Sequence, residues 1–152
     1  MNIKDRLKNY NKSKSDIEIL NSEIEILKLQ EELFDEAAET LKATSYEEGM
    51  PLHFGNEFNS KTENIAIRRE NYLINIKRLE LKLLELTENV VIVESKLRLL
   101  DNHEKFIIQK KYIENIKYNW EIRELYKKEF LKYISDTAFF GKLRSALRKM
   151  WV

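Results

Sequence analysis

The residues best placed to do chemistry lie near the end of the chain, where cations and small side chains share one face of an expected helix. Between residues 135 and 150 the apolar residues recur every three or four positions, as on one helix face: Phe139, Phe140, Leu143, Ala146, Leu147 and Met150. A helix docked through that face would present its other residues to a partner, as a DNA recognition helix does. The candidate DNA-binding residues are Ser135, Thr137, Ala138, Gly141, Lys142, Arg144, Ser145, Arg148 and Lys149.

Charge is distributed unevenly along the chain. The net charge is only +1, but residues 101–152 contain twelve Lys or Arg against seven Asp or Glu, whereas residues 1–100 contain fifteen against nineteen. A polyanion would be attracted to the C-terminal part and repelled from the rest. Imbalances of this size also occur in proteins that bind no nucleic acid, so charge alone does not decide the function.

Other kinds of chemistry are not indicated. The chain has no cysteine, which excludes disulfides, thiolate zinc sites and cysteine nucleophiles. His53 and His103 lack a second ligand at metal-binding spacing, and there is no glycine-rich phosphate loop. The acidic residues lie on helix flanks, where they pair with lysines. We therefore expect no catalytic residue, no metal, no cofactor and no enzymatic activity.

The composition predicts an all-α protein. One proline and three glycines in 152 residues are too few for the turns of a β fold, and 35% charged residues suit long amphipathic helices. No apolar run approaches the ~20 residues of a membrane span, and the first residues lack the apolar core of a targeting signal. We expect a soluble protein of the cytoplasm.

Two long helices are expected within the first hundred residues. The first covers residues 2–43, with a potential break at residues 11–15, where Ser15 would cap a new start. Its apolar residues follow a heptad seam that only Glu31 interrupts. They are Ile17, Leu20, Ile24, Leu27, Phe34, Ala38 and Leu41. The seam of the second helix is more regular and ends at Leu100. It consists of Ile65, Tyr72, Ile76, Leu79, Leu83, Leu86, Val90, Val93, Leu97 and Leu100.

A polar loop from residue 44 to about residue 62 should separate these helices. Its glycines and Pro51 stop the first helix, and Ser60 or Thr62 would cap the second, with Glu63 completing a capping box. A helix of nearly forty residues is about 60 Å long, so its stripe needs a long partner. The stripes pair either within one chain, as an antiparallel coiled-coil-like hairpin, or between two chains of a homodimer.

The last fifty residues should form three short helices. Asp101 or Asn102 caps the first, whose apolar face is Phe106, Ile107, Tyr112 and Ile113. After a break at residues 114–117 the second carries Trp120 as a core anchor, and Ser135 caps the third. This predicts two domains, a helical hairpin over residues 1–100 and a helix-turn-helix domain over residues 101–152.

This order of parts resembles a known family. An apolar helix that carries a glutamate and ends in a tyrosine is matched by Glu104, Phe106, Ile107 and Tyr112. A helix that begins with a tryptophan is matched by Trp120 and Ile122. A capped basic helix is matched by Ile134, Ser135, Thr137, Arg144, Ala146, Leu147 and Arg148. These features are similar to the phage late-transcription regulators of the RinA and ArpU group, whose C-terminal domain resembles region 4 of bacterial sigma factors. Trp120 and Ser135 lie further apart than in most members of that group.

The resemblance implies a sequence-specific regulator that activates phage or prophage late genes. Such a protein would bind double-stranded DNA in the bacterial cytoplasm, and host RNA polymerase is a potential further partner. The reading helix would enter the major groove. The alternative is a non-enzymatic interaction protein, in which the hairpin binds a protein such as RNA polymerase or a repressor and the C-terminal helices only support it.

Overall fold

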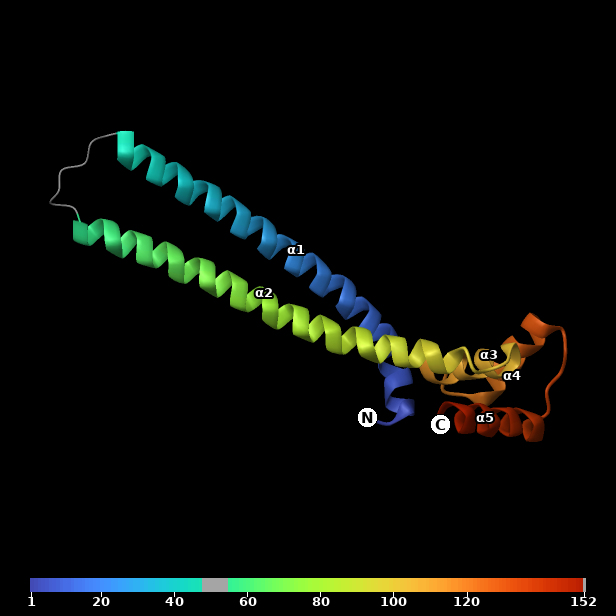
Figure 1. The fold of residues 1–152 in the computed structure, drawn as a ribbon. Coiled ribbons are helices and arrows are strands. Elements are labelled where there is room, and N and C mark those ends of the chain that lie inside the picture. Colours follow the sequence, from blue (N-terminus) through green and yellow to red (C-terminus); the bar gives the residue numbers. More distant parts are fainter. Residues whose placement is uncertain (48–54, 152) are drawn as a thin grey trace. The chain divides into compact units, whose positions relative to one another are not determined.

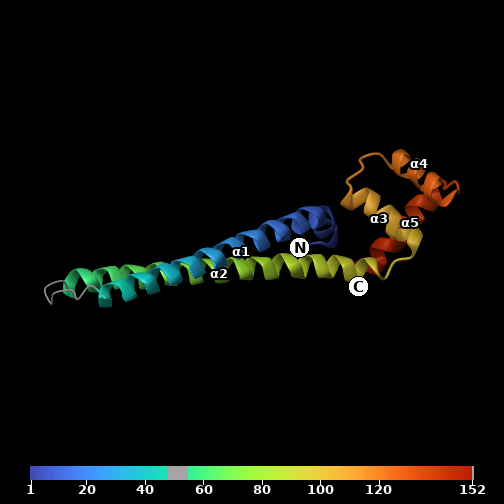
Figure 2. The same cartoon turned by 90° about the horizontal axis from the view of Figure 1, so that it is seen from above.

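The chain folds entirely into helices in the residues that the structure describes. The structure is a computed structural model that describes the backbone of residues 1–47 and 55–151 and the side chains of residues 1–37, 39 and 63–151. The helices are α1 (Ile3–Glu47), α2 (Gly55–Leu97), α3 (Asn102–Ile108), the π-helical turn η2 (Gln109–Ile113), α4 (Asn119–Phe130) and α5 (Asp136–Trp151). Helices α1 and α2 run alongside each other in opposite directions (Figure 1, Figure 2), which confirms the predicted hairpin.

Both long helices extend further than the sequence indicated. Helix α1 is continuous through residues 11–15, so the predicted break and the Ser15 cap are wrong. Leu7, which precedes that segment, and Ser13, which lies within it, are buried, and tertiary packing of this kind outweighs a weak local stop signal. Helix α2 begins at Gly55, so Ser60 and Thr62 lie within the helix and do not start it. The predicted loop is correspondingly shorter, and its centre lies outside the described residues.

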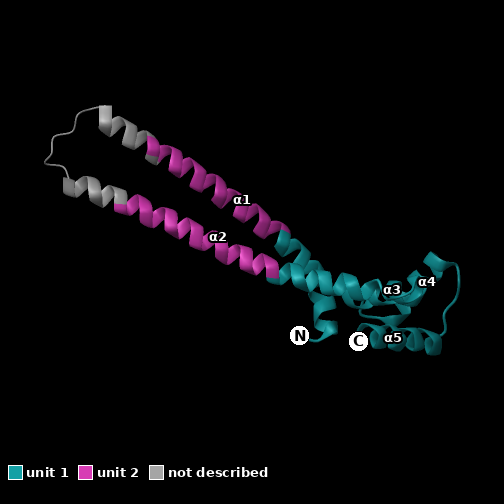
Figure 3. Ribbon diagram, viewed as in Figure 1, with its two compact units in different colours: residues 1–17, 85–152 teal, residues 18–84 magenta. Residues whose placement is uncertain are grey.

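The described residues divide into two compact units (Figure 3), unit 1 comprising Met1–Ile17 and Glu85–Val152 and unit 2 comprising Glu18–Leu84. In unit 2 the predicted seam is the contact between the helices, with Leu20, Ile24 and Ile76 buried in it. The Phe34 and Tyr72 rings lie 6.1 Å apart. Two ion pairs join the helices beside the seam, Lys28 to Glu80 at 3.4 Å and Arg69 to Asp35 at 3.5 Å. Ala38 and Leu41 fall outside the described side chains.

Unit 1 has one hydrophobic core to which all of its helices contribute. Its buried members are Leu7, Val93, Leu97, Leu100, Ile107, Ile108, Tyr112, Ile122, Tyr126, Ile134, Phe139, Leu143, Ala146 and Met150. Polar contacts join the N-terminal end of α1 to the rest of the unit. The Tyr10 hydroxyl donates to Glu94 at 2.8 Å, and the Asn11 amide donates to the carbonyl of Ile113 at 3.2 Å. This core therefore continues across residue 100, where the sequence placed a domain boundary.

The short helices of unit 1 are separated by turns that use left-handed residues other than glycine. Asn115 (φ 56°) follows η2, and Leu131 (φ 52°) follows the last residue of α4. Asparagine tolerates this conformation, whereas leucine is strained in it. Leu131 is also 90% exposed, so its side chain recovers little of that cost by packing.

Candidate nucleic-acid interface

The start of α5 is fixed by local contacts. The Ser135 hydroxyl accepts a hydrogen bond from the amide of Ala138 at 3.2 Å, and the Ser135 carbonyl accepts one from the amide of Phe139 at 2.9 Å. Arg123 of α4 pairs with Asp136 in the first turn at 3.0 Å. Ser135 is thus the N-cap, as predicted, and the Arg123 pair ties α4 to the beginning of α5.

Helix α5 packs into the core of unit 1 through a narrower stripe than the sequence indicated. Phe139, Leu143, Ala146 and Met150 are buried, and they follow one another at helical spacing. Phe140, predicted on the same face, is 40% exposed. It follows Phe139 by one residue, which places it about 100° further around the helix. Leu147 packs against the edge of the core and is only partly buried.

The outward face of α5 carries five of the nine predicted residues. They are Thr137, Ala138, Gly141, Arg144 and Arg148, and all are exposed. Arg144 and Arg148 form no hydrogen bond or ion pair with any other residue in the described part of the chain. A Cβ added at Gly141 would meet nothing within 4 Å, and α5 continues through this residue without a break. This face therefore presents two arginines beside small side chains.

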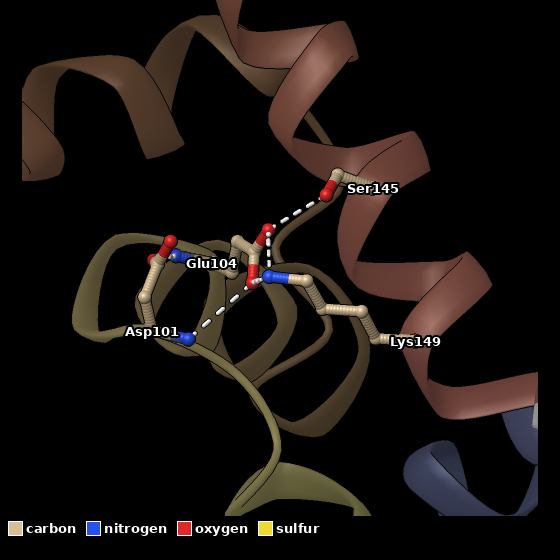
Figure 4. A network of polar contacts seen from close by, with 4 residues as sticks. All are labelled: Asp101, Glu104, Ser145 and Lys149. Atoms are coloured by element: carbon tan, nitrogen blue, oxygen red, sulfur yellow. Dashed lines mark hydrogen bonds and ion pairs between the residues drawn. The ribbon is translucent and has the colours of Figure 1, made fainter.

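Two of the predicted residues point instead toward a buried carboxylate (Figure 4). The Glu104 residue of α3 is 4% exposed. Its carboxylate accepts a hydrogen bond from Ser145 at 2.8 Å and two from the Lys149 ammonium at 3.0 and 2.8 Å. Ser145 and Lys149 lie one helical turn apart on α5, so both reach the same carboxylate. Here they connect α5 to α3.

Glu104 also completes the N-terminal cap of α3. Its amide donates to the Asp101 carboxylate at 2.7 Å, and its own carboxylate accepts from the Asp101 amide at 3.3 Å, which together make a capping box. This confirms the Asp101 cap. A single side chain therefore fixes the start of α3 and holds α5 against it.

The protonation behaviour of this cluster follows from these contacts. Burial acts to raise the pKa of Glu104, but the hydrogen bonds from Lys149, Ser145 and the Asp101 amide outweigh it and leave the pKa below its ordinary value. The hydrogen bond from the Glu104 amide lowers the pKa of Asp101, and the nearby charges of Lys142 and Lys149 act in the same direction. The hydrogen bond to Glu104 raises the pKa of Lys149. All of these groups are therefore charged at neutral pH.

The remaining candidates are placed as follows. Ser135 is exposed beside the N-terminus of α5, and Lys142 is half-buried. Two lysines of η2 have partners within the chain. Lys110 pairs with Glu114 at 2.9 Å, and Lys111 donates to Asn119 at 2.6 Å.

Trp120 does not anchor the core, and that prediction is wrong. Its side chain is 57% exposed and stacks on Tyr118, with ring centroids 6.3 Å apart. The buried stripe of α4 contains Ile122 and Tyr126, and Trp120 precedes Ile122 by two residues, which turns it to another side of the helix. This aromatic pair adds to the exposed surface of unit 1.

His103 has a structural role that the sequence did not indicate. Its Nδ1 lies 2.7 Å from the Tyr126 hydroxyl, and its ring lies 4.3 Å from that of Phe130. Ile108, absent from the predicted apolar face of the first short helix, is fully buried beside Ile107. His53 lies outside the described residues.

Comparison with known proteins adds no relative. No family model matches the chain, and neither the curated proteins nor the solved structures contain a match. Among the described residues, no three His, Asp or Glu side chains are grouped to hold a metal ion. The described helices include none with the length and apolar character needed to cross a membrane. Function must therefore be argued from the site itself.

Proposed function

We propose that the chain is a sequence-specific, DNA-binding transcriptional regulator that reads double-stranded DNA with α5. The observation that carries this is the outward face of α5, where Arg144 and Arg148 are exposed without a partner in the described part of the chain. Arginine is the side chain that most often recognises guanine, through two hydrogen bonds in the major groove, and it also pairs with phosphate. A helix that offers two such groups one turn apart suits this role.

The dimensions and the local sequence of α5 support the same reading. With 16 residues, α5 is about 24 Å long, and the major groove is wide enough to admit one helix. The N-terminal turns of recognition helices contact base edges. In α5 these turns present Thr137, Ala138 and Gly141, which allow close approach, and threonine or alanine methyl groups also contact the thymine methyl.

The contacts behind α5 would set its direction on DNA. Glu104 holds Ser145 and Lys149 from α3, and Arg123 holds Asp136 from α4. Both contacts involve side chains that turn away from the Arg144–Arg148 face. Because these supporting contacts are charged and hydrogen-bonded, they hold α5 in one orientation when DNA phosphates approach. The likeness to phage late-gene activators suggests the setting, a bacterial cytoplasm with RNA polymerase as a further partner.

Replacing both exposed arginines tests the proposal. We expect R144A/R148A to bind a fragment that the wild type retains with an affinity at least about fivefold weaker per arginine. For each arginine that neutralises a phosphate, the slope of log affinity against log salt should fall by about 0.9. The matched control is K8A/K12A, which removes the same charge from exposed positions of α1 in the same unit. Unchanged binding by a folded R144A/R148A protein would overturn the proposal.

The second candidate is an interaction protein that binds a protein partner through the hairpin. The observation in its favour is the number of exposed aliphatic side chains on α1 and α2, Ile26, Leu33 and Leu81 among them. Under this reading R144A/R148A would leave partner binding intact. The first proposal predicts that this variant loses DNA binding, and the second predicts that it keeps its protein partner.

A further inference from the structure

Unit 2 carries a second set of apolar side chains outside the seam between its helices. On α1 these are Ile19, Ile26 and Leu33, and on α2 they are Ile67, Ile74 and Leu81, each seven residues after the one before. All six are between 54% and 69% exposed. We call the two sets the outer stripes. Leu29 and Leu84 each follow a stripe residue by three positions and are also exposed, so they widen the stripes.

The outer stripes are not explained by the packing of one chain. Single exposed aliphatic residues are common on protein surfaces, but a spacing of seven brings successive residues to nearly the same side of a helix. The same spacing occurs on both helices. The hairpin's own seam is occupied by Leu20, Ile24 and Ile76, which are buried. An aligned apolar surface of this kind marks a site of association.

The helix segments that carry the outer stripes differ in the sign of their net charge, although Glu70 of α2 also lies one turn from both Ile67 and Ile74. Residues 18–39 of α1 include eight acidic residues and one lysine, whereas residues 63–84 of α2 include five Lys or Arg and three glutamates. Glu23 lies one helical turn from both Ile19 and Ile26. Lys77 and Arg78 lie one turn from both Ile74 and Leu81. These three charged residues are exposed and pair with no other described residue.

We propose that the outer stripe of α1 docks on the outer stripe of α2 in a second copy of this chain. The two stripes match in length, because each covers two heptads, or about 21 Å of helix. Charge selects the pairing, since α1 against α2 places acidic flanks on basic ones and α1 against α1 would place acid on acid. The contact uses unit 2 and is independent of the DNA-binding role proposed for α5.

The first test is the mass of the full chain across a concentration series, by sedimentation velocity or light scattering without DNA. We expect the mass of the wild type to rise with concentration from the 18.3 kDa of one chain to twice that value and beyond, because each docked pair leaves one α1 stripe and one α2 stripe free. I26S/I74S should shift to the monomer, with its helical circular dichroism retained because both side chains are exposed. The control L99S removes an equally exposed leucine from unit 1 and should dimerise normally. A monomeric wild type, or an I26S/I74S protein that dimerises like the wild type, would overturn the proposal.

A charge exchange tests the pairing itself. E23K places a lysine against Lys77 and Arg78 of a second copy, and K77E/R78E places two glutamates against Glu23 of a second copy. Each variant alone should therefore self-associate at least about tenfold more weakly. Mixing the two variants should restore the dimer. Stronger self-association of E23K, or a mixture that stays monomeric, would contradict α1-to-α2 docking. R144A/R148A should dimerise like the wild type, which keeps a failure of this contact distinct from a failure of DNA binding.

Discussion

Glu104 connects α3 to α5 through Ser145 and Lys149, and its replacement gives a graded prediction. E104A removes the acceptor of the Ser145 hydroxyl, of the Lys149 ammonium and of the Asp101 amide. A hydrogen bond to a buried charged group contributes about 1.5–3 kcal/mol. The contact with Ser145 is of this kind, and the 3.3 Å contact with the Asp101 amide is weaker. The Lys149 ammonium can return to water, because 45% of that side chain is exposed.

We therefore expect E104A to lower the free energy of unfolding of unit 1 by about 2–3 kcal/mol. E104Q keeps an acceptor for Ser145 and for the α3 cap, since glutamine also serves in a capping box, and removes only the charge. Its destabilisation should be less than half that of E104A. Both tryptophans, Trp120 and Trp151, lie in unit 1, so tryptophan fluorescence during urea unfolding reports on this unit.

The difference between wild type and E104Q should also depend on pH. The pKa of Glu104 is lowered in the folded chain from an ordinary value of 4.5. Its ionic contribution to stability is therefore fully present above about pH 4.5 and is lost as the pH falls through the lowered folded pKa. Urea midpoints of wild type and E104Q should thus differ by a constant amount above about pH 4.5 and converge as the pH falls from about 4.5 toward 3. A constant difference across that range, or an E104A protein as stable as the wild type, would refute the role assigned to this carboxylate.

Two further substitutions test the packing around α5. L131G should raise the free energy of unfolding of unit 1 by about 0.5 kcal/mol. The strain of leucine in the left-handed conformation, about 1–2 kcal/mol, exceeds the cost of the greater freedom of glycine in the unfolded chain. A lower urea midpoint would show that Leu131 is not strained. F139A, which empties a fully buried position, should cost about 3–5 kcal/mol, whereas F140A should cost much less. Equal destabilisation by F139A and F140A in thermal unfolding would contradict the observed facing of α5.

The parts of the fold that depend on local interactions could be predicted from the sequence. The Asp101 and Ser135 caps follow from side chains that bond to amides three residues away, and the seam residues Leu20, Ile24 and Ile76 follow from heptad spacing. Local signals did not predict the continuity of α1 or the start of α2.

The contacts of the candidate site could not be predicted in the same way. Glu104 lies 41 residues before Ser145 and 45 residues before Lys149 in the sequence. Residue spacing does not predict contacts over separations of this length. The Asp101–Glu104 pattern marks a capping box but does not reveal that the same carboxylate also receives α5. Trp120 was assigned to the core by residue type, although its two-residue offset from Ile122 placed it on another side of α4.

The most direct measurement of the central claim is protection of guanine N7 from methylation on a DNA fragment that the protein retains. N7 faces the major groove, so a helix inserted there shields it, and arginine is the expected contact. We predict protected guanines with the wild type and with K8A/K12A, and loss of individual protections with R144A and with R148A. A chain that retains no fragment, or protection that is unchanged when both arginines are removed, would contradict the assignment of α5 as the DNA-reading helix.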